Sequence, residues 1–208
     1  GPLLVEVNDQ DTQSGDYQDE LTQQRKSLDT SLRTMVSIDT PATETAPIEI
    51  IVSPLTELAT RKAGYVQGEI PTTLSADDLI YNAKVAALFE LEGVDITRTP
   101  VITTLDPSYT ETDGLTPSEA YGEVLATLSA QDAVSGSVRA TVEQLVAGIT
   151  EQQSADTLDT ELTFTPQAQQ TLEQSANVID LMQDVGIDET LSAEEALARA
   201  DALRAVIR

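Results

Sequence analysis

The chain has 208 residues, of which 36 are Asp or Glu and 11 are Lys or Arg, so its formal charge is -25 at neutral pH. It contains no Cys and no His, which excludes disulfides, thiolate nucleophiles, imidazole bases and the zinc sites that these residues form. Apolar residues make up 40% of the chain, enough to build a hydrophobic core.

The excess of carboxylates also limits the partners. Nucleic-acid binding requires Lys and Arg side chains that displace counterions from phosphates, so we expect no nucleic-acid partner. No apolar run approaches the roughly 18 residues of a membrane-spanning helix, so we expect no membrane insertion either. These features favour a soluble module that attracts cations.

The first 52 residues are predicted to form a small β segment. Leu3 to Val7 is a short apolar run. Leu32, Thr34, Val36 and Ile38 recur at every second position, which is the period of a strand, although the same stretch could form a short helix. Ile48 to Val52 is β-branched at nearly every position and is the clearest predicted strand.

Residues 53–208 are predicted to form an irregular bundle of about six helices, which makes the chain an α+β protein. The evidence is a series of Ser or Thr residues that can cap a helix, most of them followed by Pro or by acidic residues. The six predicted starts are Ser53-Pro54, Ser75, Thr116-Pro117, Ser135 or Ser137, Thr165-Pro166 and Ser192.

No sequence motif for catalysis is present. The ten glycines do not form a phosphate-binding loop, and no base is available to activate a serine. The adjacent acidic pairs lie at predicted helix starts, where carboxylates stabilise the helix dipole: they are Asp77-Asp78, Asp188-Glu189 and Glu194-Glu195. We therefore interpret the carboxylates as a solvated coat and expect the protein not to be an enzyme.

Calcium is the only cofactor that the composition suggests, because Ca²⁺ prefers oxygen ligands. The first candidate site is the loop that contains Asp106, Glu111 and Asp113; Asn8 to Asp11 and Asp184 to Glu189 are further candidates. None of these segments follows the pattern of an EF-hand loop. The alternative interpretation is an acidic loop that binds no metal.

The apolar residues Leu3, Leu4, Val5 and Val7 form a candidate partner strand. An exposed strand can pair with the edge of a neighbouring module, and the chain begins almost inside this run. At the other end, Ala205 to Arg208 stops within a helical pattern, so we expect the chain to be a piece of a longer protein. The alternative is that Leu3 to Val7 belongs to the chain's own sheet.

Several segments resemble a region that recurs in very large bacterial surface proteins. They are Gly1-Pro2-Leu3-Leu4-Val5-Glu6-Val7, Asp16 to Glu20 and the run Ser53-Pro54-Leu55-Thr56-Glu57-Leu58-Ala59, followed by Arg61-Lys62-Ala63. The resemblance implies a β segment that continues an immunoglobulin-like or carboxypeptidase-regulatory-like sandwich, with a helical domain appended. Proteins of this class are often secreted biofilm adhesins that are rich in calcium sites.

The leading functional hypothesis is a non-catalytic module of such an adhesin-like protein, located outside the cell or on the bacterial cell surface. It would act as a spacer, a scaffold or a ligand-presenting domain, with neighbouring modules and an extracellular protein or glycan as its partners. The alternatives are a binding domain for peptide, glycan or calcium, and a subunit of a secreted filament that is joined by strand donation.

Overall fold

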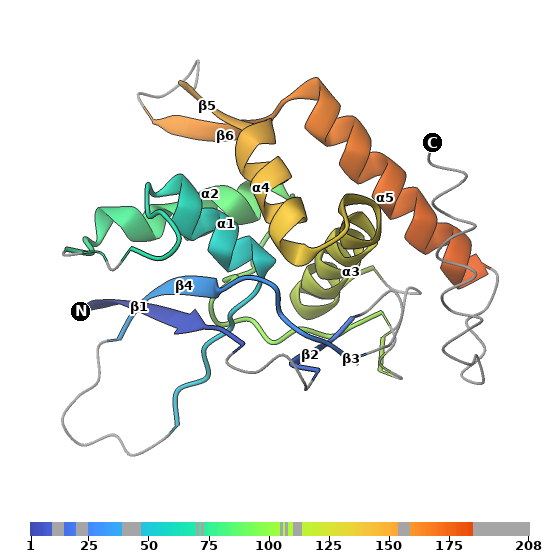
Figure 1. Ribbon diagram of the computed structural model, residues 1–208, viewed down its shortest axis with the longest axis horizontal. Coiled ribbons are helices and arrows are strands. Elements are labelled where there is room, and N and C mark those ends of the chain that lie inside the picture. The colour runs from blue at the N-terminus through green and yellow to red at the C-terminus, as the bar shows by residue number, and fades with distance from the viewer. Residues whose placement is uncertain are drawn as a thin grey trace.

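The computed structural model describes residues 1–9, 15–19, 25–38, 47–69, 71, 73–104, 106, 108–109, 114–153 and 159–184. In these residues the chain is an α+β protein with five α-helices and small antiparallel sheets of two strands each. Figure 1 shows the β1–β4 sheet beneath α1 and α2, with α3, α4 and α5 beside them.

The first sheet pairs β1 (Pro2–Val7) with β4 (Leu32–Ser37) in antiparallel register, with Val5 opposite Thr34. Residues 32–36 of β4 are buried, because α1 (Pro54–Lys62) packs against this strand. A shorter ribbon joins β2 (Tyr17–Gln18) to β3 (Arg25–Lys26). The predicted β segment is therefore present, but as two separate ribbons.

The strand predicted at Ile48 to Val52 is wrong. Residues 47–53 have no regular secondary structure, and Ile48 is 42% exposed. The segment is held by a bond from the Ile51 N–H to the Thr97 carbonyl at 2.9 Å. A β-branched composition favours an extended backbone, but a strand also needs a neighbouring strand, which the described residues do not supply here. No sandwich is formed, since the described sheets have two strands each.

The helix-start signals are confirmed for four helices. Ser53 caps α1, Thr116 caps α3 (Pro117–Ser135), and Ser137 caps α4 (Val138–Gly148), each through a side-chain oxygen that accepts a backbone N–H. The Ala168 N–H donates to the Thr165 hydroxyl at the start of α5 (Pro166–Asp184). Ser192 lies outside the described residues.

The remaining signal, at Ser75, is confirmed in a modified form. The Asp78 N–H donates to the Ser75 hydroxyl, and a short 3-10 turn, η1 (Asp77–Leu79), precedes α2 (Ile80–Leu88). The structure also contains a hairpin that the sequence analysis did not predict. Its strands are β5 (Ile149–Gln153), which continues directly from α4, and β6 (Thr160–Phe164).

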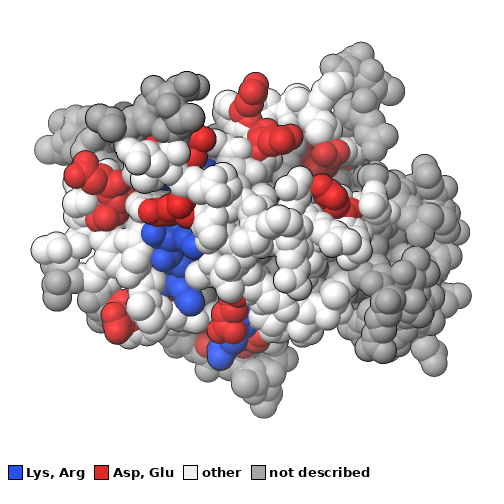
Figure 2. Space-filling view, turned by 90° about the horizontal axis from the view of Figure 1, so that it is seen from above, with Lys and Arg blue, Asp and Glu red and all other residues white. Residues whose placement is uncertain are grey.

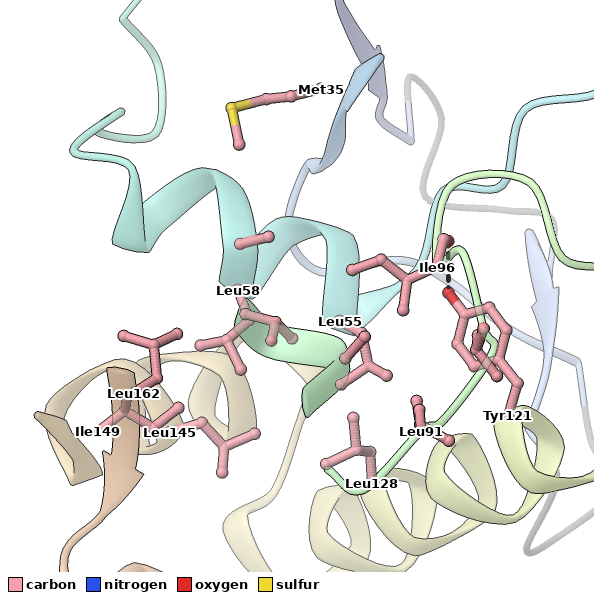
Figure 3. Close-up of a cluster of buried hydrophobic side chains, with 14 residues drawn as sticks. Met35, Leu55, Leu58, Leu91, Ile96, Tyr121, Leu128, Leu145, Ile149 and Leu162 are labelled. Carbon is pink, nitrogen blue, oxygen red and sulfur yellow. Dashed lines mark hydrogen bonds between the residues drawn. The ribbon is translucent and has the colours of Figure 1, made fainter. Parts of the chain in front are cut away.

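One hydrophobic cluster joins the β1–β4 sheet to the helices. Leu55 and Leu58 on α1 are fully buried at its centre, and Figure 3 shows them pointing toward side chains from several elements. These neighbours are Met35, Leu91, Ile96, Tyr121, Leu128, Leu145, Ile149 and Leu162. The two predicted regions thus share a core. Within the described ranges, no helix is both long and apolar enough to cross a lipid bilayer.

Candidate functional site

A pocket of about 320 Å³ is lined by residues of the β2–β3 ribbon, the first turn of α1 and the helices α3 and α4. Its lining is mostly apolar, and we call it the Asp132 pocket after the acidic side chain that lines it from α3. The apolar lining residues are Val7, Leu28, Leu32, Val52, Pro54, Leu125, Leu128 and Val138, and the polar ones are Asp16, Tyr17, Asp19, Ser53, Ser129 and Asp132.

Asp132 occupies an unfavourable position in its helix. It lies in the last turn of α3, which ends where the Gly136 N–H donates to the Asp132 carbonyl at 2.8 Å. Gly136 has a φ of 103°, a conformation that glycine adopts readily and that lets α4 begin two residues later. The free carbonyls of a helix C-terminus carry partial negative charge, so the backbone disfavours a carboxylate here.

The Asp132 carboxyl is buried and only partly hydrogen-bonded. The residue is 8% exposed, and its Oδ1 accepts no hydrogen bond within the described part of the chain. Burial raises the pKa of this carboxyl to about 7, against the opposing effect of a hydrogen bond from Thr141. Among the surrounding charges, Asp19 and Asp29 raise this pKa and Lys26 lowers it. Near neutral pH, Asp132 therefore exchanges a proton with solvent, unlike an ordinary aspartate.

The β2–β3 ribbon brings a second buried carboxylate to the pocket. The Asp19 side chain is fully buried and pairs with Lys26 Nζ at 2.6 Å, while the Lys26 side chain stays 35% exposed. Tyr17 lies beside this pair, and its pKa is raised by burial and by the charges of Asp132, Asp19 and Asp29. The pocket thus has a negative electrostatic potential within apolar walls.

The interpretation of the carboxylates as a solvated coat is wrong for four of them. Asp19, Glu57, Glu119 and Asp132 are buried. On the face that Figure 2 shows, Asp and Glu side chains are scattered among uncharged residues, and a few Lys and Arg side chains lie beside them. The position of Asp132 had a signal in the sequence, because it follows Leu128 by four residues and therefore continues the apolar face of its helix.

Of the three first calcium candidates, Asp106, Glu111 and Asp113, the structure describes Asp106 alone. Asp106 lies in an exposed turn, where its Oδ1 accepts the Ser108 N–H at 2.8 Å and the Ser108 hydroxyl at 2.6 Å. These bonds lower the pKa of Asp106. Glu111 and Asp113 lie outside the described residues. In the part of the chain that is described, no three acidic side chains form a group that could hold a metal ion.

The predicted partner strand forms β1 and lies in the chain's own sheet. Leu3 and Val7 are 49% and 48% exposed, whereas Leu4 packs against the core. Gly1 and Ile38 each donate a backbone hydrogen bond to the carbonyl of the other. This pair determines which residues of β1 bond to β4. The backbone groups of odd-numbered β1 residues therefore face β4, and those of Leu4 and Glu6 face away from it.

The two outer edges of this sheet differ. On β4, the Arg33 N–H donates to Glu57 Oε2 at 3.0 Å. The Met35 carbonyl accepts from Asn82 at 2.8 Å, and the Ser37 carbonyl accepts from Arg98 at 3.2 Å. Side chains therefore cap the edge of β4, a common way to prevent further strand pairing. No described residue caps the outward backbone groups of Leu4 and Glu6 on β1.

Comparison of the chain with known proteins gave no match. No protein-family model, no curated protein and no solved structure is significantly similar to it. Inference about its function therefore rests on the Asp132 pocket and on the outer edge of β1.

Proposed function

We propose that the chain is a non-catalytic, ligand-binding module of a large extracellular bacterial surface protein of the adhesin type, with the Asp132 pocket as its binding site. The observation that carries this proposal is the Oδ1 atom of Asp132, which is buried in a mainly apolar pocket and accepts no hydrogen bond from any residue that the structure describes. A buried polar atom without a partner costs free energy, and a bound ligand would supply that partner.

The anatomy of the pocket supports binding. Ligand sites typically have apolar walls with a few polar groups that orient the ligand, and volumes upward of roughly 300 Å³. The Asp132 pocket, at about 320 Å³, is at the low end of that range. It fits one side chain or one small molecule better than a folded surface.

The polar neighbours of Asp132 favour binding over catalysis. The Ser53 hydroxyl caps α1 and bonds to the Tyr121 hydroxyl at 2.8 Å, so it is not free to act as a nucleophile. The Lys26 ammonium is paired with Asp19. The sequence contains no His or Cys, the residues that most often activate or supply a nucleophile.

A fragment screen tests this proposal. We expect some small apolar fragments with a polar head to raise the melting temperature saturably, and to shift backbone NMR signals of Leu125, Leu128 and Val138. Asp132→Asn should weaken the binding of these fragments, whereas Asp77→Asn, which removes an exposed charge on η1, should not. Catalytic turnover that Asp132→Asn abolishes, or the absence of any saturable fragment, would overturn the proposal.

The edge of β1 favours a second candidate function, a subunit joined to its neighbours by strand pairing. The supporting observation is that side chains cap the edge of β4, whereas none of the described residues bonds to the outward backbone groups of Leu4 and Glu6 on β1. The outer edge would accept a strand, so Leu3 to Val7 need not leave β4. Light scattering at increasing protein concentration tests this function, and a chain that stays monomeric throughout contradicts it.

Glu6 offers a sharp variant for this second function. Its N–H faces away from β4 and its side chain is exposed, so Glu6→Pro removes an outward donor without removing a β1–β4 bond. We expect Glu6→Pro to abolish association. Glu6→Ala, which removes the charge and keeps the N–H, should associate at least as strongly as the natural chain.

A further inference from the structure

The charges around Asp132 indicate which chemical class of ligand its pocket takes. We infer that the pocket selects a protonated primary amine on a short apolar stem, such as a lysine side chain or a free alkylamine. This inference rests on the proposed function, because it names the ligand of the same site.

An anionic head group does not suit the pocket. Asp132, Asp19 and Asp16 all line it, and the C-terminal end of α3 adds the partial negative charge of its carbonyls. Among the described residues, Lys26 is the cation that acts on Asp132, and it lies in an ion pair with Asp19. An anionic ligand would therefore be repelled by these carboxylates at short range, in surroundings that screen charge poorly.

A cationic head group should bind the buried Asp132 carboxylate more strongly than a neutral hydrogen-bond donor does. An alcohol can supply one hydrogen bond to Asp132, but it leaves the buried negative charge uncompensated. An ammonium group supplies up to three N–H donors together with the opposite charge. Rotation of the carboxyl about χ2 exchanges Oδ1 and Oδ2, so either oxygen can accept from the ligand while the other keeps the Thr141 bond.

The walls determine the stem of the ligand. Leu32, Leu125, Leu128 and Val138 line the pocket from β4, α3 and α4, and each methylene group of a ligand that is buried against them favours binding. A chain of a few methylene groups that ends in an ammonium matches this combination of apolar walls and a single acidic acceptor.

Protonation of Asp132 gives the inference a pH signature. An alkylamine has a pKa near 10.4 and stays protonated at neutral pH, whereas Asp132 takes up a proton near pH 7. Among the described residues, the other charged or titratable groups near this carboxyl are Asp16, Asp19, Lys26 and Tyr17 in and beside the ribbon and Asp29 after it, and Thr141 of α4 bonds to it. Burial raises the pKa of Tyr17, so its phenol stays neutral between about pH 6 and pH 8. We therefore expect the affinity for the amine to decrease as the pH falls below about 7, and the decrease should approach tenfold for each pH unit.

The experiment compares three probes of similar stem length by NMR titration and calorimetry. n-Butylamine carries the charge and the donors, butyltrimethylammonium carries the charge without N–H donors, and 1-butanol carries a donor without the charge. At about pH 8 we expect n-butylamine to bind at least tenfold more tightly than either of the others. That preference should shrink at about pH 6, and Asp132→Asn should remove it, while Asp77→Asn should preserve it.

The outcomes separate the inference from the proposed function. If butanol binds saturably and as tightly as butylamine at about pH 8, the pocket is a binding site but the inference of an amine ligand is wrong. If butylamine keeps its affinity in Asp132→Asn, the inference is also wrong, because another group holds the amine. If no fragment of any class binds, the proposed function itself fails. Circular dichroism of Asp132→Asn confirms that the variant has folded.

A last pair of probes identifies the source of the amine. A blocked Gly-Lys-Gly peptide presents the same ammonium on a protein side chain, and the peptide with acetylated lysine lacks its charge. Tighter binding of the unmodified peptide than of n-butylamine identifies a lysine of a partner protein as the ligand. Binding of n-butylamine alone identifies a free small amine. Equal binding of the acetylated and unmodified peptides contradicts the inference.

Discussion

Arg33 on β4 and Glu57 on α1 form a fully buried ion pair between the β1–β4 sheet and the helices. Arg33 Nε donates to Glu57 Oε2 at 2.9 Å and Arg33 Nη2 to Oε1 at 2.7 Å. The guanidinium also donates to the carbonyls of Tyr65 and Val66 at 3.1 and 3.0 Å. Glu57 lies in the first turn of α1, where the helix dipole favours its charge. The pair therefore fixes α1 on the sheet with almost every polar group satisfied.

The first prediction concerns the removal of one member of this pair. In Glu57→Gln the Arg33 charge stays buried without a counterion, a change that typically costs about 3–5 kcal/mol. We expect a loss of that size in the free energy of unfolding, measured by urea denaturation. Arg33→Met should cost a similar amount, because it leaves the Glu57 carboxylate buried alone.

The control is the double variant Arg33→Met with Glu57→Met. Apolar replacement of a whole buried pair is often neutral or stabilising, so the double variant should be more stable than either single variant. Additive losses in the double variant would show that the two side chains do not stabilise the fold as a pair. A loss below about 1 kcal/mol for Glu57→Gln, the range of exposed pairs, would contradict the first prediction.

The second prediction concerns stability and pH at Asp132. Burial raises the pKa of this carboxyl in the folded chain from 3.8 to about 7, so between these values the folded state binds more protons than the unfolded state. The free energy of unfolding therefore decreases as the pH rises through this window and is level above it. One pKa unit corresponds to about 1.4 kcal/mol, so ionisation of Asp132 lowers the free energy of unfolding by an amount on the order of 4 kcal/mol at most.

Asp132→Asn isolates this effect. The variant cannot ionise, so it should be more stable than the natural chain at about pH 8, and the difference should shrink toward about pH 5. Asp78 and Asp106 have lowered pKa values, so their contributions are lost as the pH falls, but only below about pH 4. A difference between the two chains that does not vary with pH would contradict the assignment.

Local signals in the sequence predicted the helices well. A capping hydroxyl satisfies backbone N–H groups within three residues of itself, so Ser53, Thr116, Ser137 and Thr165 indicate helix starts without knowledge of the rest of the fold. The alternating run at β4 was also detectable, because its period reflects the geometry of a strand itself.

Features that depend on distant partners were not predicted. The extended run at Ile48 to Val52 has strand composition but no neighbouring strand, and composition does not reveal pairing. The position of Asp132 on the apolar face of α3 was detectable from spacing alone. Its meeting with Asp19 from the β2–β3 ribbon was not, because the two residues are far apart in the sequence and come together only through tertiary packing.

The third prediction concerns salt. The chain carries a formal charge of -25, and the repulsion between exposed carboxylates is screened over about 10 Å at 0.1 M and about 3 Å at 1 M ionic strength. We expect the melting temperature to rise between low and near-molar NaCl. CaCl₂ at matched ionic strength provides the control, since a further rise with calcium indicates a specific site, with the loop of Asp106, Glu111 and Asp113 as its first candidate. A flat melting temperature in NaCl would contradict the prediction.

The fourth prediction is that Gly122→Ala destabilises the chain, although alanine is the better helix former. In the interior of an exposed helix this change gains about 1 kcal/mol. Gly122 on α3 instead lies against the segment before the helix, and an added Cβ would come within 1.9 Å of the Ile102 carbonyl oxygen. That carbonyl belongs to a backbone fixed by the bond from the Ile102 N–H to the Ser118 carbonyl at 3.1 Å. The clash therefore cannot be relieved by a rotamer change, and overpacking of this kind costs about 1–3 kcal/mol or more. Thermal denaturation should show a lower melting temperature, whereas an increase would mean that the two segments do not make this close contact in solution.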